Sequence, residues 1–91
     1  MLSAKDTVKK LTRFQIESIL AYAYVGYAVS PASKLLHISY CSLNNDLIYA
    51  KANTGLDPKS REDCNILIAM IEEVRKEEMH GSHLSIETFF G

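Results

Sequence analysis

The sequence predicts an all-α fold of four or five helices around a helix-turn-helix, and three observations predict it. Apolar residues recur at helical spacing through most of the 91-residue chain. Two of the expected helices are short and separated only by a tight turn at His37-Ile38, which is the order of a helix-turn-helix. Residues of the kind that caps helices precede the expected segments, namely Thr12, Ser30, Ser39 and Ser60.

The N-terminal part predicts one or two helical turns over Ser3–Lys10 and then a longer helix. Thr12 and Gln15 have the spacing of a capping box, and Gly26 is expected to end this helix. We expect the tyrosines of this region to lie partly in the core and partly on a subunit interface, or to form a stacking platform for single-stranded nucleic acid. They are Tyr22, Tyr24 and Tyr27. The apolar positions at helical spacing are Phe14, Ile16, Ile19, Leu20, Ala23 and Tyr24.

The helix-turn-helix is expected to begin at Ser30, as N-cap, with Pro31 at the first helical position. Ser39 then caps a second helix that runs through about Ala52 and ends at residues 53–55. The first of these helices has its apolar face at Ala32, Leu35 and Leu36.

The packing expected of this unit follows from the sizes of its side chains. Ala32 is small where the two helices cross, and Ile38 is expected to fill the core beneath the turn. Leu43 and Leu47 are expected to face inward. The outward positions are expected to be Tyr40, Cys41, Asn44, Asn45, Asp46, Ile48 and Tyr49.

The last helix is expected over Arg61–Met79, opened by a capping-box pair of Ser60 and Asp63. Residues 80–91 alternate in polarity and suggest a short extended segment. The single domain, residues 1–91, therefore divides into a basic segment 1–11, a helical core 12–79 and a tail 80–91. The apolar side of the last helix is expected at Ile66, Leu67, Met70, Ile71 and Val74.

Composition and motifs exclude several classes of protein. Hydrophobic residues make up 47% and charged residues 23% of the chain, as in ordinary globular domains. We expect no enzyme and no cofactor, because no nucleophile elbow, glycine-rich phosphate loop or metalloprotease motif is present. His37 and Cys41 lack a second ligand pair, so no metal is expected. Without a long apolar stretch, the chain is expected to be cytoplasmic, with Cys41 and Cys64 as reduced, mostly buried packing residues.

Two stretches of the sequence resemble known regulators. SPASKLLHISYCSLNNDL, Ser30 to Leu47, follows the pattern of the Fis-type helix-turn-helix, and LLHISYCSLNNDLIYAKANTGLDP resembles the C-terminal domain of PucR and CdaR-like (sugar-diacid regulator) transcription factors. The resemblance implies a DNA-binding domain whose closing helix starts near Ser60. The recognition helix of that family is usually basic, whereas Ser39 to Ala50 contains no Lys or Arg here.

Two functions follow as expectations. The first is a small transcription regulator that binds duplex DNA as a homodimer, because a chain with net charge -1 binds a polyanion weakly as one copy. The alternative is a protein-interaction module with a repurposed helix-turn-helix, such as an accessory or phage-type inhibitor of a larger regulatory or nucleic-acid machine. A third reading is a small DNA-packaging subunit of a phage. Expected DNA contacts are Ser42, Asn44 and Asn45 for bases, and Lys5, Lys9, Lys10, Arg13, Lys34 and Lys51 for phosphates, with Tyr40 also on the DNA-binding surface. Expected protein contacts are Tyr40, Ile48, Tyr49, Phe89 and Phe90.

Overall fold

The structure, a computed structural model, describes residues 4–78 of the chain. These residues form helices without strands, so the all-α prediction is confirmed for them. The expected extended tail, with Phe89 and Phe90, lies outside the described residues. The helices are α1 (Ala4–Lys9), α2 (Arg13–Tyr24), α3 (Val29–Leu36), α4 (Tyr40–Thr54) and α5 (Arg61–Glu78).

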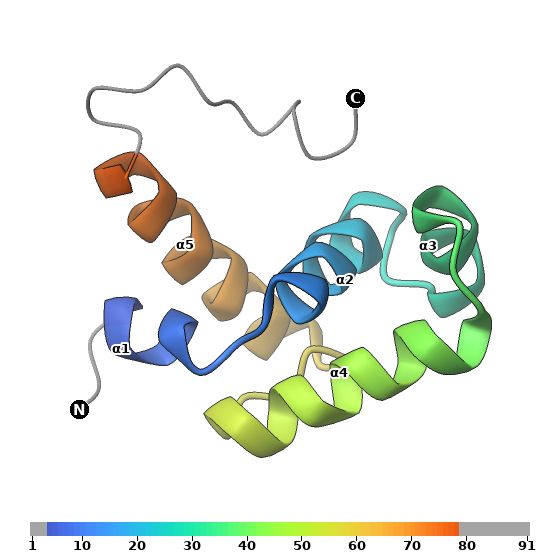
Figure 1. Cartoon of the computed structure of the whole chain (residues 1–91), viewed down its shortest axis with the longest axis horizontal. Coiled ribbons are helices and arrows are strands. Elements are labelled where there is room, and N and C mark those ends of the chain that lie inside the picture. The colour runs from blue at the N-terminus through green and yellow to red at the C-terminus, as the bar shows by residue number, and fades with distance from the viewer. Residues whose placement is uncertain (1–3, 79–91) are drawn as a thin grey trace.

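Helix α2 is the centre of the arrangement. It packs against α3, α4 and α5, whereas α1 packs against α5. In Figure 1, α3 and α5 lie on opposite sides of α2, and α4 runs along one edge of the molecule. As a result, α4 contacts the rest of the domain through one side only.

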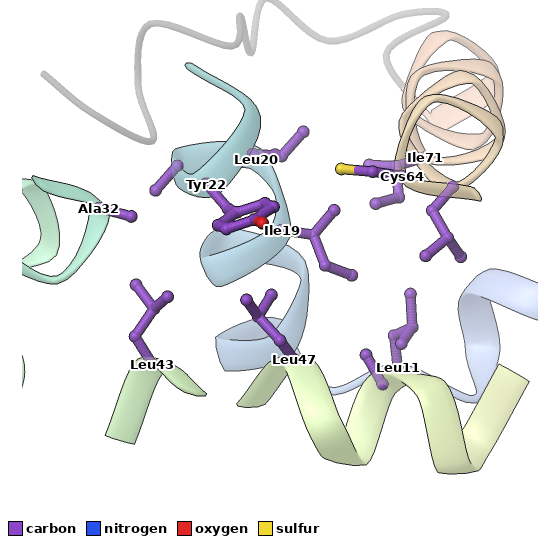
Figure 2. Packing of buried hydrophobic residues seen from close by; sticks show 12 residues of the cluster. Leu11, Ile19, Leu20, Tyr22, Ala32, Leu43, Leu47, Cys64 and Ile71 are labelled. Carbon is purple, nitrogen blue, oxygen red and sulfur yellow. The ribbon is translucent and has the colours of Figure 1, made fainter. Parts of the chain in front are cut away.

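The core forms where α2 meets α4 and α5. Figure 2 shows Leu43 and Leu47 pointing from α4 toward Ile19 and Tyr22 on α2. Both leucines are buried, as the sequence predicts, and Ala32 is buried where α3 approaches them. Such contacts remove apolar surface from water, at about 25 cal/mol per Å². The position of α4 is therefore set by its leucines.

The start of α2 confirms the predicted capping box. The amide of Gln15 donates to Oγ1 of Thr12 at 3.1 Å, and the amide of Thr12 donates to Oε1 of Gln15 at 3.0 Å. These bonds satisfy two amides that have no acceptor within the helix. The N-terminal end of α2 is therefore well defined.

The expected apolar face of α2 is wrong at its two ends. Phe14 is 71% exposed and Tyr24 is 75% exposed, although Ile19 and Leu20 are buried as expected. A helix surrounded by three others is buried around much of its circumference, so a single apolar stripe does not describe it. Phe14 and Tyr24 lie at the two ends of α2 on sides that the neighbouring helices leave uncovered.

Helix α3 starts two residues earlier than predicted. Its N-cap is Ala28, which makes no side-chain capping bond, so Ser30 and Pro31 lie inside the first turn. Proline is tolerated there because the first amides of a helix lack intrahelical acceptors. The Ser30 carbonyl instead accepts a hydrogen bond from the Ser33 hydroxyl at 2.7 Å.

Helix α5 starts at Arg61 as predicted, but the side-chain contacts at its start differ from the prediction. Oδ2 of Asp63 accepts the amide of Asp57 at 3.0 Å, while the amide of Ser60 donates to the Asp57 carbonyl at 2.9 Å. The Ser60–Asp63 capping box is therefore replaced by a turn that starts at Asp57. Leu67 and Ile71 are buried as expected, but Ile66 is exposed and Cys64 takes the buried position.

Tyr27 connects the α2–α3 loop to α5. Its backbone is left-handed, with φ 66°, directly after Gly26 with φ 87°. Its ring meets the buried Tyr22 edge-on at 5.9 Å between centroids, and the Arg61 guanidinium lies 4.8 Å from its centroid. Its hydroxyl donates to Oδ1 of Asn65 at 2.9 Å. These contacts stabilise a left-handed backbone conformation that residues other than glycine rarely adopt.

Candidate nucleic-acid interface

The turn between α3 and α4 is a Schellman motif centred on His37. His37 has φ 57° and ψ 41°, and its amide donates to the Lys34 carbonyl at 3.2 Å. The amide of Ile38 donates to the Ser33 carbonyl at 3.0 Å. Glycine is the usual residue at this left-handed position. The predicted tight turn is therefore present, with a histidine where a glycine is expected.

Ile38 does not fill the core beneath this turn. Its side chain is 37% exposed, whereas Leu35 and Leu36 at the end of α3 pack partly against the core. Ile38 directly follows the left-handed His37 in the link between α3 and α4, and this position leaves its side chain partly in solvent. The prediction of a buried apolar plug at this position is wrong.

Helix α4 begins at the predicted cap. Ser39 is extended, with φ -72° and ψ 157°, and its Oγ accepts the amide of Ser42 at 3.0 Å. The Ser39 hydroxyl also donates to Oγ of Ser42 at 2.9 Å. The Ser42 hydroxyl, expected to contact a base, therefore takes part in the capping of α4.

Leu43, Leu47 and Ala50 define the buried side of α4. At 3.6 residues per turn, the middle of the opposite side consists of positions spaced four, three and four residues apart. These positions all lie in exposed parts of the helix: Cys41, Asn45, Ile48 and Ala52. We call them the outer line of α4. It is neutral, and two of its four side chains are small.

The two tyrosines of α4 lie on opposite sides of the helix. Tyr40 is 56% exposed and Tyr49 is 60% exposed, and they are nine residues apart. Nine residues are about two and a half turns, so the tyrosines flank the outer line instead of sharing one face with Ile48. Ile48, 48% exposed, lies between them on the outer line.

Asp46 does not point outward as predicted. It is half-buried, and its Oδ2 accepts a hydrogen bond from the Ser18 hydroxyl of α2 at 2.7 Å. Sequence reasoning missed Ser18; the available signal was a hydroxyl among the apolar residues of α2. The only acidic residue between Ser39 and Ala50 is thus directed toward the domain.

The two asparagines of α4 differ in exposure. Asn45 is exposed on the outer line, whereas Asn44 is half-buried at the side of the helix. The two were expected to act together on base edges. Only Asn45 has the outward position that such a role requires.

Cations lie at both ends of α4 and are absent from its outer line. Exposed Lys34 belongs to α3 and precedes the turn into α4. At the other end, Nδ2 of Asn53 donates to Oε1 of Gln15 at 3.5 Å, which places the start of α2 beside the end of α4. The exposed cations near this junction are Lys9, Lys10, Arg13 and Lys51.

Two of these cations are paired with carboxylates. Nε of Arg13 lies 3.2 Å from Oε1 of Glu17, and Nζ of Lys51 lies 3.7 Å from Oδ2 of Asp57. Both pairs are open to solvent, so they are weak and the cations can readily bind other anions instead.

The expected basic segment, residues 1–11, contains buried residues. Thr7 and Leu11 are buried, and α1 is part of the packed domain.

A small hollow lies beside α4, with a volume of about 230 Å³. The backbone amide of Lys59 donates to Oδ1 of Asp57 at 3.0 Å and so shapes the segment on its far side. The carboxylate at the rim is already engaged by this bond and by the pair with Lys51. The residues around the hollow are Leu47, Ile48, Lys51, Asp57 and Lys59.

The two thiols lie in different environments. Cys41 is exposed on the outer line of α4, so the prediction of a packing residue there is wrong. Cys64 is buried, as predicted, and burial raises the pKa of its thiol to about 11. Within residues 4–78, no three His, Cys, Asp or Glu side chains are grouped to hold a metal ion. None of the helices in that range is long and apolar enough to cross a bilayer.

The chain was compared with protein-family models, with curated proteins and with solved structures, and none of these matches it.

Proposed function

We propose that this protein is a small transcription regulator that binds duplex DNA through α4, as a homodimer. The observation that carries the proposal is the position of α4. Leu43, Leu47 and Ala50 hold one side of the helix against α2, and the other side is exposed at the edge of the molecule (Figure 1). With side chains, an α-helix is about 10–12 Å across, and the major groove is about 12 Å wide.

The charges around α4 support the proposal. The hydrogen bond from Ser18 turns the Asp46 carboxylate away from the outer line, so no acidic group there repels a phosphate. The start of α4 favours an anion, because its first amides lack intrahelical acceptors and its dipole is positive there. Lys34 lies near that end, and Lys10 and Arg13 lie near the other end. Cations at both ends suit contacts with the sugar-phosphate backbone on each side of the groove.

The homodimer follows from the small number of these cations. The net charge is -1, so one copy gains little from the release of counterions. Two copies on one duplex double the phosphate contacts and set the spacing of two half-sites. We therefore expect two copies to bind each operator.

The test is a fluorescence-anisotropy titration of the purified chain against random duplex DNA at low salt, repeated at higher salt. Micromolar binding that weakens as salt rises supports the proposal, because phosphates are then being neutralised. Sedimentation of the complex checks for two copies per duplex. Absence of binding at low salt would refute the proposal.

One observation favours the second candidate, a protein-interaction module. Tyr40, Ile48 and Tyr49 leave large apolar areas in solvent, and no Lys or Arg lies between Ser39 and Ala50. Tyrosine is enriched in protein interfaces. On this alternative, Tyr49→Ala removes a partner from a pull-down without unfolding the domain, whereas Tyr24→Ala on α2 does not. Equal partner retention by both variants and the parent chain counts against it.

A further inference from the structure

Resting on the proposed DNA binding, we propose that the outer line of α4 selects A·T base pairs in the major groove. Asn45 recognises adenine, and Ile48 and Ala52 contact thymine methyl groups. The proposal is carried by the identity of the side chains on the side of α4 opposite Leu43 and Leu47. It names the base pairs that this surface can recognise.

The side chain of Asn45 has an outward position on α4. Asn45 lies nearly half a turn away from the buried leucines, between Cys41 and Ile48 on the outer line. The side-chain amide of Asn45 makes no hydrogen bond within the described part of the chain. A primary amide that is free to offer one acceptor and one donor matches N6 and N7 of adenine. Asn45 therefore has both the position and the side chain that recognition of adenine requires.

The other outer-line positions suit thymine. Ile48 is 48% exposed, and Ala52 follows it four residues later. The major-groove edge of thymine is the one that carries a methyl group, and apolar side chains contact it. A small residue at position 52 also allows the helix backbone to approach the base edges closely. Adenine and thymine thus each find a partner on α4.

G·C pairs find no partner on this surface. Guanine is read by Arg or Lys, and neither lies on the outer line; Lys51 of α4 lies off this line and is paired with Asp57. Cytosine is read by a carboxylate, and the carboxylate of Asp46 accepts from Ser18 instead. Ile48 would leave the donor of cytosine unsatisfied, which costs free energy. The selection therefore has an attractive part and a repulsive part.

The tyrosines suit this arrangement. Tyr40 and Tyr49 are exposed on opposite sides of α4, so on this proposal their hydroxyls contact phosphates on the two sides of the groove that holds the helix. Tyrosine hydroxyls contact phosphate oxygens in protein–DNA complexes. They supply contacts without charge, and the binding face remains neutral.

The experiment compares duplexes of equal length in the anisotropy assay. We expect an A·T duplex to bind at least about fivefold more tightly than a G·C duplex, since one good bidentate pair contributes about 1 kcal/mol or more. An inosine·cytosine duplex separates the two grooves, because its minor groove resembles A·T and its major groove resembles G·C. We expect it to bind as weakly as G·C. Replacing thymine by uracil removes the methyl group and should weaken binding severalfold.

Variants connect the preference to the residues. Asn45→Ala should abolish the A·T preference while mixed-sequence DNA still binds, and Ile48→Ala should reduce the effect of uracil, leaving the part that Ala52 supplies. Asn53→Ala is the matched control, because Asn53 lies off the outer line and contacts Gln15. Circular dichroism checks that each variant is folded.

The outcomes separate the two proposals. Equal binding of A·T and G·C duplexes, or inosine·cytosine binding as tight as A·T, overturns the selection while DNA binding stands. Absence of binding to every duplex overturns both. A preference that survives Asn45→Ala overturns the role of Asn45.

Discussion

The hydroxyl of Ser18 on α2 donates a hydrogen bond of 2.7 Å to Oδ2 of Asp46 on α4. It joins the central helix to the exposed one across 28 positions of sequence and orients the carboxylate toward the domain. The same bond thus adds a polar contact to the leucine packing that positions α4, and it removes an acidic group from the outer line.

A double-mutant cycle measures this bond. We expect Ser18→Ala to lower the free energy of unfolding by about 1–3 kcal/mol, because Asp46 is left half-buried without its donor. Removing both partners should cost less than the two single changes together, with a coupling of about 0.5–3 kcal/mol. Urea unfolding of the parent, Ser18→Ala, Asp46→Ala and the double variant gives these values. Strict additivity would show that the two groups do not interact.

The cations at the ends of α4 should determine the salt dependence of DNA binding. Arg13→Ala together with Lys34→Ala should lower the affinity and flatten the slope of log K against log salt by about 0.9 for each phosphate that is no longer neutralised. The assay is anisotropy at several salt concentrations. Lys76→Ala is the charge control, since Lys76 is exposed in the last turn of α5, and that end of α5 lies away from α4 in Figure 1. A similar change of slope in the control would mean that net charge alone is responsible.

The left-handed turn should allow an increase in stability. We expect His37→Gly to stabilise the domain by about 0.5–1 kcal/mol, because Gly has no Cβ to clash at φ 57° and this gain exceeds its larger entropy in the unfolded chain. That corresponds to a rise in Tm of about 2–8 °C for a domain of this size. His37→Ala should show no such gain. A lower Tm for the glycine variant would contradict the assignment of strain to this residue.

The buried thiol should make stability depend on pH above neutrality. Burial raises the pKa of Cys64 to about 11 from an ordinary value of 9.0, so the folded state keeps the proton that the unfolded state loses. The stabilising effect is complete below about pH 9 and is lost as pH rises toward 11, with about 2 kcal/mol gone at pH 10.5.

Urea unfolding at pH 8 and pH 10.5 tests this loss. Cys64→Ala should be less stable than the parent at pH 8 and should close the difference at pH 10.5. Cys41→Ala, which removes the exposed thiol, should follow the parent at both values. A constant difference between the parent and Cys64→Ala would contradict the prediction.

The ring of Tyr27 should matter more than its hydroxyl. Tyr27→Ala removes the contacts with Tyr22 and Arg61 and keeps the strained backbone, so we expect the free energy of unfolding to fall by about 2–3 kcal/mol. Tyr27→Phe removes only the exposed bond to Asn65 and should cost less than about 1 kcal/mol. Thermal unfolding compares the two, and equal losses of stability would mean that the hydroxyl carries the effect.

The helix starts that could be predicted depend on neighbouring residues. The bonds between Thr12 and Gln15, and from Ser42 to Ser39, span three residues each and need nothing beyond the local chain. Where a neighbouring turn contributes to a helix start, the capping pattern in the sequence led to a wrong prediction. Asp63 accepts from Asp57, and α3 starts at Val29 without a side-chain cap.

Exposure was harder to predict than helix position, because exposure depends on what lies opposite a side chain. Phe14 and Tyr24 belong to the apolar pattern of α2 but lie on sides of it that α3, α4 and α5 do not cover. Asp46 reads as an outward acid until Ser18 is brought beside it. Asn44 and Asn45 are adjacent in sequence, and only the latter is exposed on α4, whereas the former is half-buried.

The order of the amino acids was enough to predict the all-α fold, the turn before Ser39 and the inward leucines Leu43 and Leu47, because caps and apolar periodicity act over three or four residues. Which side of α4 is neutral and exposed, and where the Asp46 carboxylate points, became clear only once the helices were packed together. These features depend on contacts between residues far apart in the chain, and local patterns carry no record of them.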